Sequence, residues 1–458
     1  MPLPPWRVVM WALVGIVLLL TPGVVGLPAR GASPDVTVDF TASVRSINAL
    51  TFGMDESAYG MGGLTLPTDP LEQQRISSLR LGHMRVDLEL ATPGDPNSAV
   101  LCGADGCVGR TGSPSGDDYV RAIKNVGAEP VAIIPIYRDS LSLSVTDAAN
   151  MVKHFNITAA TLNPVKRWII YNEPDGAGMS ASDYSTFFNQ MHDAMKAIDP
   201  TIKVGGPATA WFNSNFLQTF LTASGSRLDF LDFHQYGQGG SVAKSADQLL
   251  AETISYESRI NQLRSTVQSI VPARASQIEI QVGEWNLDWD GDPKAYTNFS
   301  TVWGASVLGR IARAGGLSLQ YASKNGSIGA LFETNDANYG VSRNDPLPIY
   351  HAHGMFTGQS LFRSFGKTLV EASTTLNNVE VYASADSKNI VVINKDLVAQ
   401  YDATFGLTGV TTGSTEVWRK DENVPAFGPP AKLESVGIVN GTFSYVLAPL
   451  SVTTFVIK

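Results

Sequence analysis

The central part of the chain alternates short apolar runs with longer amphipathic segments. The apolar runs predict buried strands at residues 47–55, 79–88, 129–137, 166–173, 202–208, 228–236, 277–285 and 329–334. Apolar residues at helical spacing predict helices at 117–126, 184–198, 245–270 and 299–314. Eight units of strand followed by helix favour an α/β fold, a (β/α)₈ TIM barrel. An open doubly wound sheet is the alternative, but no glycine-rich phosphate loop follows any of the runs.

From residue 356 onward the pattern changes to short strands separated by turns. These strands are predicted at 379–383, 390–393, 415–418, 442–447 and 451–457, which favours a β-sandwich at 356–458. Near the other end, the alternating segment 36–44 predicts an exposed strand with no partner in the barrel. We expect residues 33–46 to join the sandwich, so that both ends of the chain build this domain around a barrel at 47–355.

The first residues form a third pattern. The uncharged run Val8–Leu20 is shorter than the roughly 20 residues that span a bilayer. Val24 and Gly26 fit the small-residue positions of a cleavage site. The pattern predicts a signal peptide within residues 1–32, cleaved near 26–32, and a secreted protein without a membrane span after cleavage. An uncleaved anchor is the alternative, because Arg7 alone is a thin positive region.

Composition adds two constraints. The chain has 458 residues, 44% of them hydrophobic, which is enough for two domains. Its formal net charge of −9 does not support a basic surface for nucleic acid. Cys102 and Cys107 are the only two cysteines, and in a secreted protein they predict a local disulfide.

The chemistry is predicted at the strand ends, because active sites of (β/α)₈ barrels lie at the C-terminal ends of the strands. Glu173 ends the fourth predicted strand and Glu284 the seventh, on opposite sides of the barrel. Two facing carboxyl groups are what cleavage of a glycosidic bond needs: one protonates the leaving oxygen, and the other attacks the anomeric carbon or activates water. The remaining polar strand-end candidates are Arg85, Asn172, His234 and Tyr236.

These strand ends also carry a family resemblance. Trp168-Ile-Ile-Tyr-Asn-Glu-Pro174, His234-Gln-Tyr236 and Gly283-Glu-Trp-Asn286 resemble the retaining glycoside hydrolases of clan A. Within the clan the chain most resembles family 39, the group of β-xylosidases and α-L-iduronidases, whose members also have a trailing β-sandwich. The resemblance implies that the enzyme needs no cofactor, that Glu173 is the general acid/base and that Glu284 is the nucleophile.

The resemblance also implies roles for the neighbours. Asn172 would hold the 2-hydroxyl of the sugar, and Tyr236 would donate a hydrogen bond to Glu284. Arg85 would pair with Glu284 and keep it ionised. His234 would lie beside Glu284, and the Trp285 ring would contact a sugar.

Two positions depart from the family pattern. The clan usually places a tryptophan at the end of the eighth strand as the floor of the sugar pocket, and here Phe332 or Glu333 takes that place. The third strand offers Tyr137 and Arg138 instead of the usual histidine. The extra acid and the extra cation predict a pocket for an unusual or substituted sugar, with Glu333 among the substrate contacts.

Some alternatives remain open at this stage. Strict alternation on the seventh strand puts Glu284 on the same face as Ile280 and Val282, so either those residues fill the barrel interior or a bulge re-aims the strand. Trp211 and Phe212 could form a sugar platform or belong to the core. An inactive carbohydrate-binding barrel is a competing function, and an inverting glycosidase would need a wider carboxyl separation of about 6.5–9.5 Å.

No metal is expected. Asp288-Trp-Asp-Gly-Asp292 has the acidic spacing of a calcium loop but lacks the glutamate at its twelfth position, so we expect a polar loop at the rim of the site. His351 and His353 do not have the i, i+4 spacing of a helical metal pair.

Overall fold

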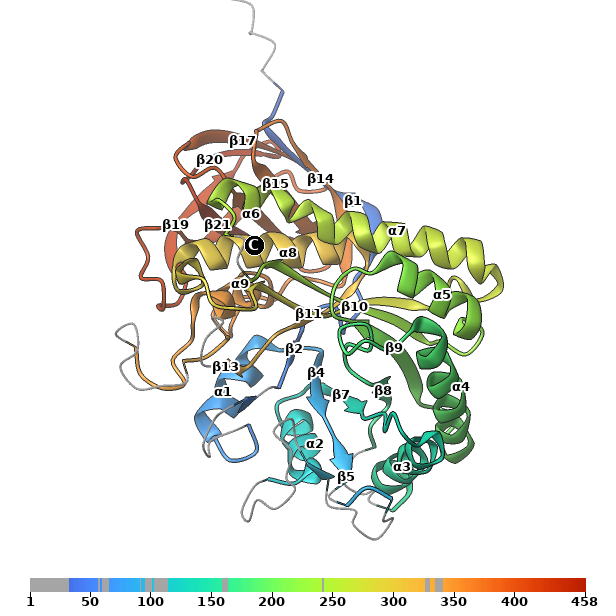
Figure 1. Cartoon of the computed structure of the whole chain (residues 1–458). Coiled ribbons are helices and arrows are strands. Elements are labelled where there is room, and N and C mark those ends of the chain that lie inside the picture. The colour runs from blue at the N-terminus through green and yellow to red at the C-terminus, as the bar shows by residue number, and fades with distance from the viewer. Residues whose placement is uncertain are drawn as a thin grey trace, which may run out of the picture. The chain divides into compact units, whose positions relative to one another are not determined.

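In the computed structural model, eight parallel strands close into a barrel (Figure 1). The structure describes residues 33–56, 58–59, 66–90, 92–94, 101–102, 114–158, 164–240, 243–325, 330–333 and 341–458. In chain order the barrel strands are β2 (Gly53–Asp55), β4 (His83–Asp87), β7 (Glu129–Ile134), β8 (Arg167–Ile170), β9 (Lys203–Thr209), β10 (Phe230–Gln238), β11 (Glu279–Asp288) and β12 (Leu317–Gln320). The predicted barrel is confirmed.

Helices follow most of these strands and cover the barrel. They are α1 (Pro70–Leu79), α2 (Gly116–Asn125), α3 (Leu141–Lys153), α4 (Ala181–Ile198), α5 (Ser214–Ser224), α6 (Ala246–Glu252), α7 (Ile254–Ile270), α8 (Asn298–Ala314) and α9 (Pro348–Thr357). Ser180 caps α4, because its side chain accepts the N–H of Asp183 at 3.1 Å. The helix predicted at 245–270 is two helices, which meet at the buried Thr253.

Shorter elements lie in the loops. They are the strands β3 (Ala58–Tyr59), β5 (Glu89–Leu90), β6 (Leu101–Cys102) and β13 (Lys324–Asn325), a π-helical turn at His154–Thr158, and 3₁₀ turns at Pro272–Arg274 and Pro293–Tyr296. β3 pairs with β13, and β5 pairs with β6.

The eighth barrel strand is not where the sequence pattern predicts it. It is β12, which begins two residues after Gly315 ends α8 in a left-handed conformation. Its polar residues Ser318 and Gln320 are fully buried, so the segment lacks the continuous apolar pattern of a central strand. The predicted segment 329–334 is apolar for another reason: Phe332 is buried and its ring lies 5.5 Å from that of Tyr350 in α9.

The second domain is a mixed sheet of nine strands. In chain order these are β1 (Val36–Ser46), β14 (Thr368–Thr374), β15 (Val379–Ser384), β16 (Asn389–Asn394), β17 (Tyr401–Thr408), β18 (Gly413–Lys420), β19 (Ala431–Ile438), β20 (Thr442–Leu447) and β21 (Ser451–Ile457). β1 pairs with β14 antiparallel and with β17 parallel, which confirms that the N-terminal strand joins the C-terminal domain. The rings of Phe405, Phe443 and Phe455 meet in its own core.

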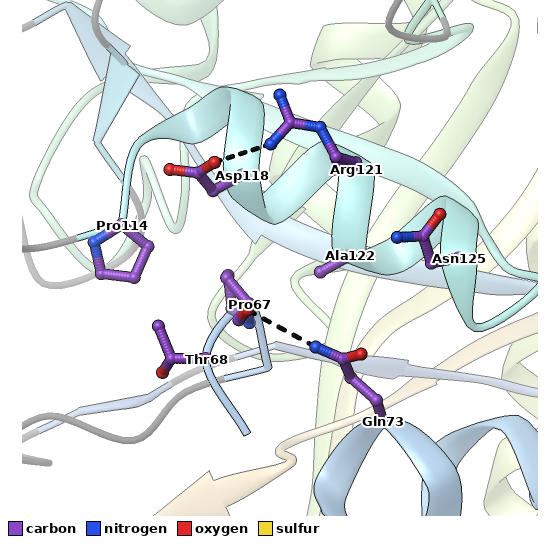
Figure 2. Close-up of a pocket in the computed structure, with 8 residues that line it drawn as sticks. All are labelled: Pro67, Thr68, Gln73, Pro114, Asp118, Arg121, Ala122 and Asn125. Atoms are coloured by element: carbon purple, nitrogen blue, oxygen red, sulfur yellow. Dashed lines mark hydrogen bonds and ion pairs between the residues drawn. The ribbon is translucent and has the colours of Figure 1, made fainter. Parts of the chain in front are cut away.

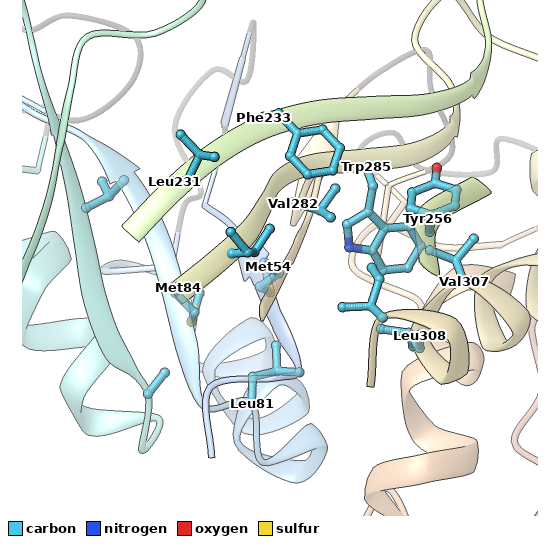
Figure 3. Close-up of a cluster of buried hydrophobic side chains, with 14 of the residues drawn as sticks. Met54, Leu81, Met84, Leu231, Phe233, Tyr256, Val282, Trp285, Val307 and Leu308 are labelled. Atoms are coloured by element: carbon cyan, nitrogen blue, oxygen red, sulfur yellow. The ribbon is translucent and has the colours of Figure 1, made fainter. Parts of the chain in front are cut away.

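Buried charges fasten the sheet domain to the barrel. Glu380 of β15 accepts hydrogen bonds from Arg310 of α8 at 2.8 Å and lies 2.6 Å from the ammonium of Lys395. The main apolar core of the barrel, part of which Figure 3 shows, continues onto Tyr382 and Val391 of the sheet.

The predictions for the N-terminal segment and the disulfide fall outside the described residues, since these exclude 1–32 and Cys107. Among the described helices, none combines the length and the apolar character that a membrane span requires.

Candidate active site

Glu173 is held in position by an unusual backbone at the end of β8. Tyr171, Glu173 and Ala208 have positive φ angles of 65°, 50° and 52°. Residues with side chains rarely adopt this conformation, and it costs free energy that the surroundings must offset. Here the N–H of Glu173 bonds the carbonyl of Ala208 at 2.9 Å, and that of Tyr171 bonds Ile134 at 2.8 Å. Strain of this kind gathers at functional sites.

Glu284 reaches the barrel mouth through a bulge in β11. Phe233 pairs with Val282, and the next residue His234 pairs with Glu284, so Gly283 is an extra residue. A Cβ atom at Gly283 would lie 2.1 Å from a carboxylate oxygen of Asp232, so only glycine fits. Before the bulge Val282 faces the core under the helices. The bulge reverses the alternation and turns Glu284 toward the other acid, which settles the open alternative.

The two carboxylates meet across His234. Its Nδ1 lies 2.9 Å from Oε1 of Glu173 and 3.5 Å from Oε2 of Glu284. Glu173, His234 and Glu284 each present an atom within 4.8 Å of the other two. The side chain of Glu173 is 36% exposed, whereas Glu284 and His234 are buried. The site therefore has one solvent-accessible acid and one enclosed acid.

Arg85 organises the enclosed side. It is fully buried, and its Nη2 lies 2.5 Å from Oε1 of Glu284 and 3.1 Å from Oδ1 of Asn172. Its Nη1 donates to the carbonyl of Gly283 at 2.9 Å, and its Nε pairs with Asp55 at 2.8 Å. One guanidinium thus fixes the nucleophile candidate, the bulge and Asn172 together.

These neighbours set the charge of Glu284. Burial alone would raise the pKa of Glu284, but His234, Arg85 and the hydroxyl of Tyr236 outweigh burial and lower the pKa below its usual value. Tyr236 donates this hydrogen bond to Oε2 of Glu284 at 2.7 Å. For His234, burial acts in the opposite direction and alone would lower the pKa, but Glu284 and Glu173 outweigh burial and raise it. The buried acid is kept as an anion beside Arg85.

Two further acids lie beneath the cluster. Burial raises the pKa of Asp55 well above its usual value despite the attraction of Arg85. Burial raises the pKa of Asp232 to about 6, against the opposing effects of His234 and Arg85. The site therefore contains more carboxyl groups than cations.

The structure brings together Arg85, Asn172, Glu173, His234, Tyr236 and Glu284, but it places Trp285 elsewhere. Because the bulge reverses the alternation of side chains, Trp285 is fully buried among the core residues that Figure 3 shows. Its ring lies 6.0 Å from that of Trp303 and 5.8 Å from that of His353. A ring in the core under the helices cannot contact a sugar in the barrel mouth.

Glu333 does not end the eighth strand either. Its N–H bonds the carbonyl of Asp345 at 3.0 Å, and its own carbonyl accepts the N–H of Asn344 at 2.8 Å. The residue that follows β12 is Tyr321. Its N–H bonds the carbonyl of Trp285 at 3.0 Å, and its carbonyl accepts from Asn286 at 2.6 Å. Tyr321 also contributes, after burial and Glu284, to a raised pKa of Tyr236, so the two phenols are neighbours.

Tyr321 is not among the predicted site residues, because the apolar pattern places the eighth strand at 329–334. The signal was present: a pair of glycines, Gly315 and Gly316, ends α8 and precedes the alternating residues 317–320.

The acidic loop after β11 closes on itself. Gln238 donates to Oδ2 of Asp288 at 2.8 Å and to Oδ2 of Asp292 at 2.5 Å. Oδ1 of Asp288 accepts the N–H groups of Asp290 and Gly291. Among the described residues, the one group of three or more possible metal ligands is Glu173, His234 and Glu284. His351 instead contacts the carbonyl of Phe427, and the ring of its neighbour His353 lies near Trp285.

A cavity of about 390 Å³ lies apart from these residues, between the start of α1 and α2 (Figure 2). Among its polar side chains, Arg121 pairs with Asp118 at 2.8 Å and Gln73 donates to the carbonyl of Leu66 at 2.7 Å. Its lining includes none of the predicted site residues.

Comparison with known proteins points to the same chemistry. The model of the family described as Glycosyl hydrolases family 39 matches residues 148–395, more than half of the chain, including Glu173, His234 and Glu284. No curated protein matches the chain in sequence.

Solved structures resemble it closely in fold. An α-L-arabinofuranosidase from Thermotoga maritima in complex with arabinose has a TM-score of 0.71 at 16% identity, over 93% of this chain and 100% of that one. CelM2, a bifunctional glucanase-xylanase from a metagenome library, has a TM-score of 0.65 at 16% identity, over 93% and 99%. A family 44 xyloglucanase from Paenibacillus polymyxa has a TM-score of 0.67 at 15% identity, over 92% and 99%. At these identities the likeness shows the fold.

Proposed function

The chain belongs to family 39 of the glycosyl hydrolases, and from this premise we propose that it is a secreted, retaining glycosidase. Its substrate is a plant or microbial polysaccharide, or an oligosaccharide derived from one. Glu284 is the nucleophile and Glu173 the general acid/base.

One observation supports this assignment most strongly: one carboxylate oxygen of Glu173 lies within 4.8 Å of one carboxylate oxygen of Glu284. Retaining glycosidases hold the two carboxyl groups about 5–5.5 Å apart, whereas inverting enzymes need about 6.5–9.5 Å to admit a water molecule. The spacing favours direct attack by Glu284 over activation of water, and so favours retention over inversion.

In the first step Glu284 attacks the anomeric carbon. The glycosidic bond breaks with its electron pair going to the leaving oxygen, which takes the proton of Glu173. Arg85 and Tyr236 hold Glu284 ionised and orient it for this attack. In the second step the ionised Glu173 takes a proton from water, which attacks the anomeric carbon and releases Glu284. His234, which contacts both acids, orients Glu173 through each change of charge.

The sugar lies against Asn172 and Tyr321. Asn172 is fixed by Arg85 beside Glu173 and can hold the 2-hydroxyl, whose hydrogen bonds strengthen in the transition state. Tyr321 takes the strand-end position that the resemblance assigns to a tryptophan. A phenol leaves more room and adds a hydroxyl group, which suits a substituted sugar.

The test is a panel of aryl glycosides, including arabinosides and xylosides, followed by a 2-fluoro glycoside of the best sugar. We expect hydrolysis, and a covalent adduct on Glu284 detected by mass spectrometry of peptides. An inactive carbohydrate-binding barrel would bind sugars without turnover or adduct. An inverting enzyme would release the opposite anomer, which NMR of the first product detects.

A further inference from the structure

Two loops on one side of the barrel mouth are joined by a single carboxylate. Asp175 lies in the loop after β8, two residues beyond Glu173, and β9 lies next to β8 (Figure 1). Its Oδ1 accepts the N–H of Ala210 at 2.9 Å, and its Oδ2 accepts from the Asn213 side chain at 3.0 Å. The loop that carries the acid/base is therefore tied to the loop after β9.

The joined loops also approach closely. A Cβ atom at Gly176 would lie 3.2 Å from Cβ of Ala210 and 3.6 Å from Cβ of Glu173. Ala210 is therefore a near neighbour of Glu173, and the next residue in the chain is Trp211.

Trp211 is exposed although the residues after it are anchored. The ring of Phe212 lies 5.3 Å from that of Phe233, and the guanidinium of Arg259 lies over the Phe212 ring at 5.1 Å from its centre. Asn213 caps α5 by accepting the N–H of Phe216. Trp211 is nevertheless 53% exposed. The structure thus separates the two aromatic residues: Phe212 packs against the core, and Trp211 stands on a fixed loop in solvent.

We propose that Trp211 is a platform for the sugar of the leaving group, and that the substrate therefore has a sugar on that side of the scissile bond. The inference rests on the proposed function, in which Glu173 protonates the leaving oxygen. That oxygen must lie at the Glu173 carboxyl, so the leaving group extends over the Glu173 side of the mouth, where Trp211 lies. A large flat ring packs well on the apolar face of a pyranose or furanose. Small aryl leaving groups would not need this contact.

Transfer of the glycosyl group from Glu284 to an added acceptor sugar tests the platform without knowledge of the natural substrate. In a retaining enzyme a sugar can replace water in the second step. Its hydroxyl oxygen attacks the anomeric carbon, and the bond from that carbon to Glu284 breaks with the electron pair returning to the carboxylate. Glu173 takes the hydroxyl proton. The acceptor occupies the same place as the leaving sugar, so the ratio of transfer to hydrolysis reports on that place.

We expect Trp211→Ala to lower the transfer-to-hydrolysis ratio about tenfold, because one aromatic contact is lost. With an activated aryl glycoside as donor, its kcat for hydrolysis should stay near that of the wild type. Trp211→Phe should restore part of the transfer. The matched control is Trp289→Ala: Trp289 is 55% exposed but follows β11, and its ring lies against Gly239 after β10. This control should keep the ratio of the wild type.

The platform is refuted if Trp211→Ala transfers as well as the wild type, or if both tryptophan variants lose transfer equally. Labelling of Glu284 by the 2-fluoro glycoside, measured in all variants, separates the two proposals. Labelling with unchanged transfer overturns the platform alone. Failure of the wild-type protein to label or to hydrolyse any glycoside overturns the proposed function and the platform with it.

Discussion

Two buried glutamates in this molecule have similar surroundings, and only one of them is placed to react. Glu284 at the barrel mouth is bound by Arg85 and Tyr236. Glu380, between barrel and sheet domain, is bound by Arg310 and Tyr382. Burial alone would raise the pKa of either group, and in both cases the neighbouring cations outweigh it and lower the pKa. A buried, ionised glutamate beside arginine and tyrosine therefore does not by itself identify an active site.

The difference lies in what else surrounds each carboxylate. Both oxygens of Glu380 accept from several protein donors: Arg310, Lys395, Ser306 and Tyr382. Glu284 instead faces the partly exposed carboxylate of Glu173 across His234. Glu173 itself has a backbone with positive φ. A second acid that is open to solvent and sits on strained backbone distinguishes the surroundings of Glu284 from those of Glu380.

The largest expected effect is on turnover. Glu284→Gln should lower kcat by about 10⁶-fold on any substrate, because an amide cannot form the covalent intermediate. Glu380→Gln is the matched control, and its kcat per folded molecule should equal that of the wild type. Hydrolysis of an activated aryl glycoside, normalised to the folded fraction from circular dichroism, measures both. Equal losses in the two variants would contradict the distinction between the two glutamates.

Loss of the acid should have a smaller and substrate-dependent effect. Glu173→Gln should lower kcat/KM by about 10²–10⁴-fold for a sugar leaving group, because the leaving oxygen is no longer protonated. A dinitrophenyl leaving group needs little protonation. For a substrate with this leaving group, kcat/KM should therefore fall far less. Glu252→Gln is the control, since Glu252 is exposed on α6 and pairs with Lys244. Identical losses of Glu173→Gln on both substrates would argue against acid catalysis by Glu173.

Of the two glutamate variants, Glu380→Gln should have the larger effect when stability is measured. Glu380→Gln should lower the free energy of unfolding by about 3–5 kcal/mol at pH 7, because Arg310 and Lys395 lose a buried partner. The folded-state pKa of Glu380 is lowered, so its stabilisation is present above the unfolded pKa and is lost as pH falls through the folded pKa. Denaturant unfolding at pH 7 and at lower pH should therefore show the free energies of unfolding of the wild type and of Glu380→Gln converging as the pH falls.

Glu284→Gln should destabilise less than Glu380→Gln. The active site has a surplus of acids, since Asp55 and Asp232 both have raised pKa values beneath Glu284. Removing one carboxylate there relieves repulsion and offsets part of the lost pairing with Arg85. A larger loss for Glu284→Gln would show that the active-site cluster is the more stabilising of the two.

The sequence predicts one of these glutamates and not the other. Glu284 lies at the end of a recognisable apolar run, where (β/α)₈ barrels place their active-site residues. Glu173, Arg85 and Tyr236 are predicted in the same way. Glu380 depends on Arg310, 70 residues away, and no local pattern encodes that pairing.

The misplaced residues have equally local causes. The position of Trp285 cannot be decided by strict alternation, because a glycine bulge looks like any other glycine in a strand. The strand β12 escapes prediction because its buried positions include Ser318 and Gln320, which bury polar groups where a barrel strand usually has apolar ones.

The smallest expected effect comes from removing the tyrosine hydroxyl that binds each glutamate, Tyr236 at Glu284 and Tyr382 at Glu380. Tyr236→Phe removes a hydrogen bond to the charged Glu284 and should lower kcat/KM by about 10–100-fold. Without that bond the pKa of Glu284 rises. The nucleophile must be ionised, so activity is lost as pH falls through its pKa, and the acidic limb of the kcat/KM profile should move to higher pH. Tyr382→Phe, the control at Glu380, should leave that profile in place and lower the free energy of unfolding by about 1–3 kcal/mol. An acidic limb unmoved in Tyr236→Phe would mean that Tyr236 positions Glu284 without tuning its charge.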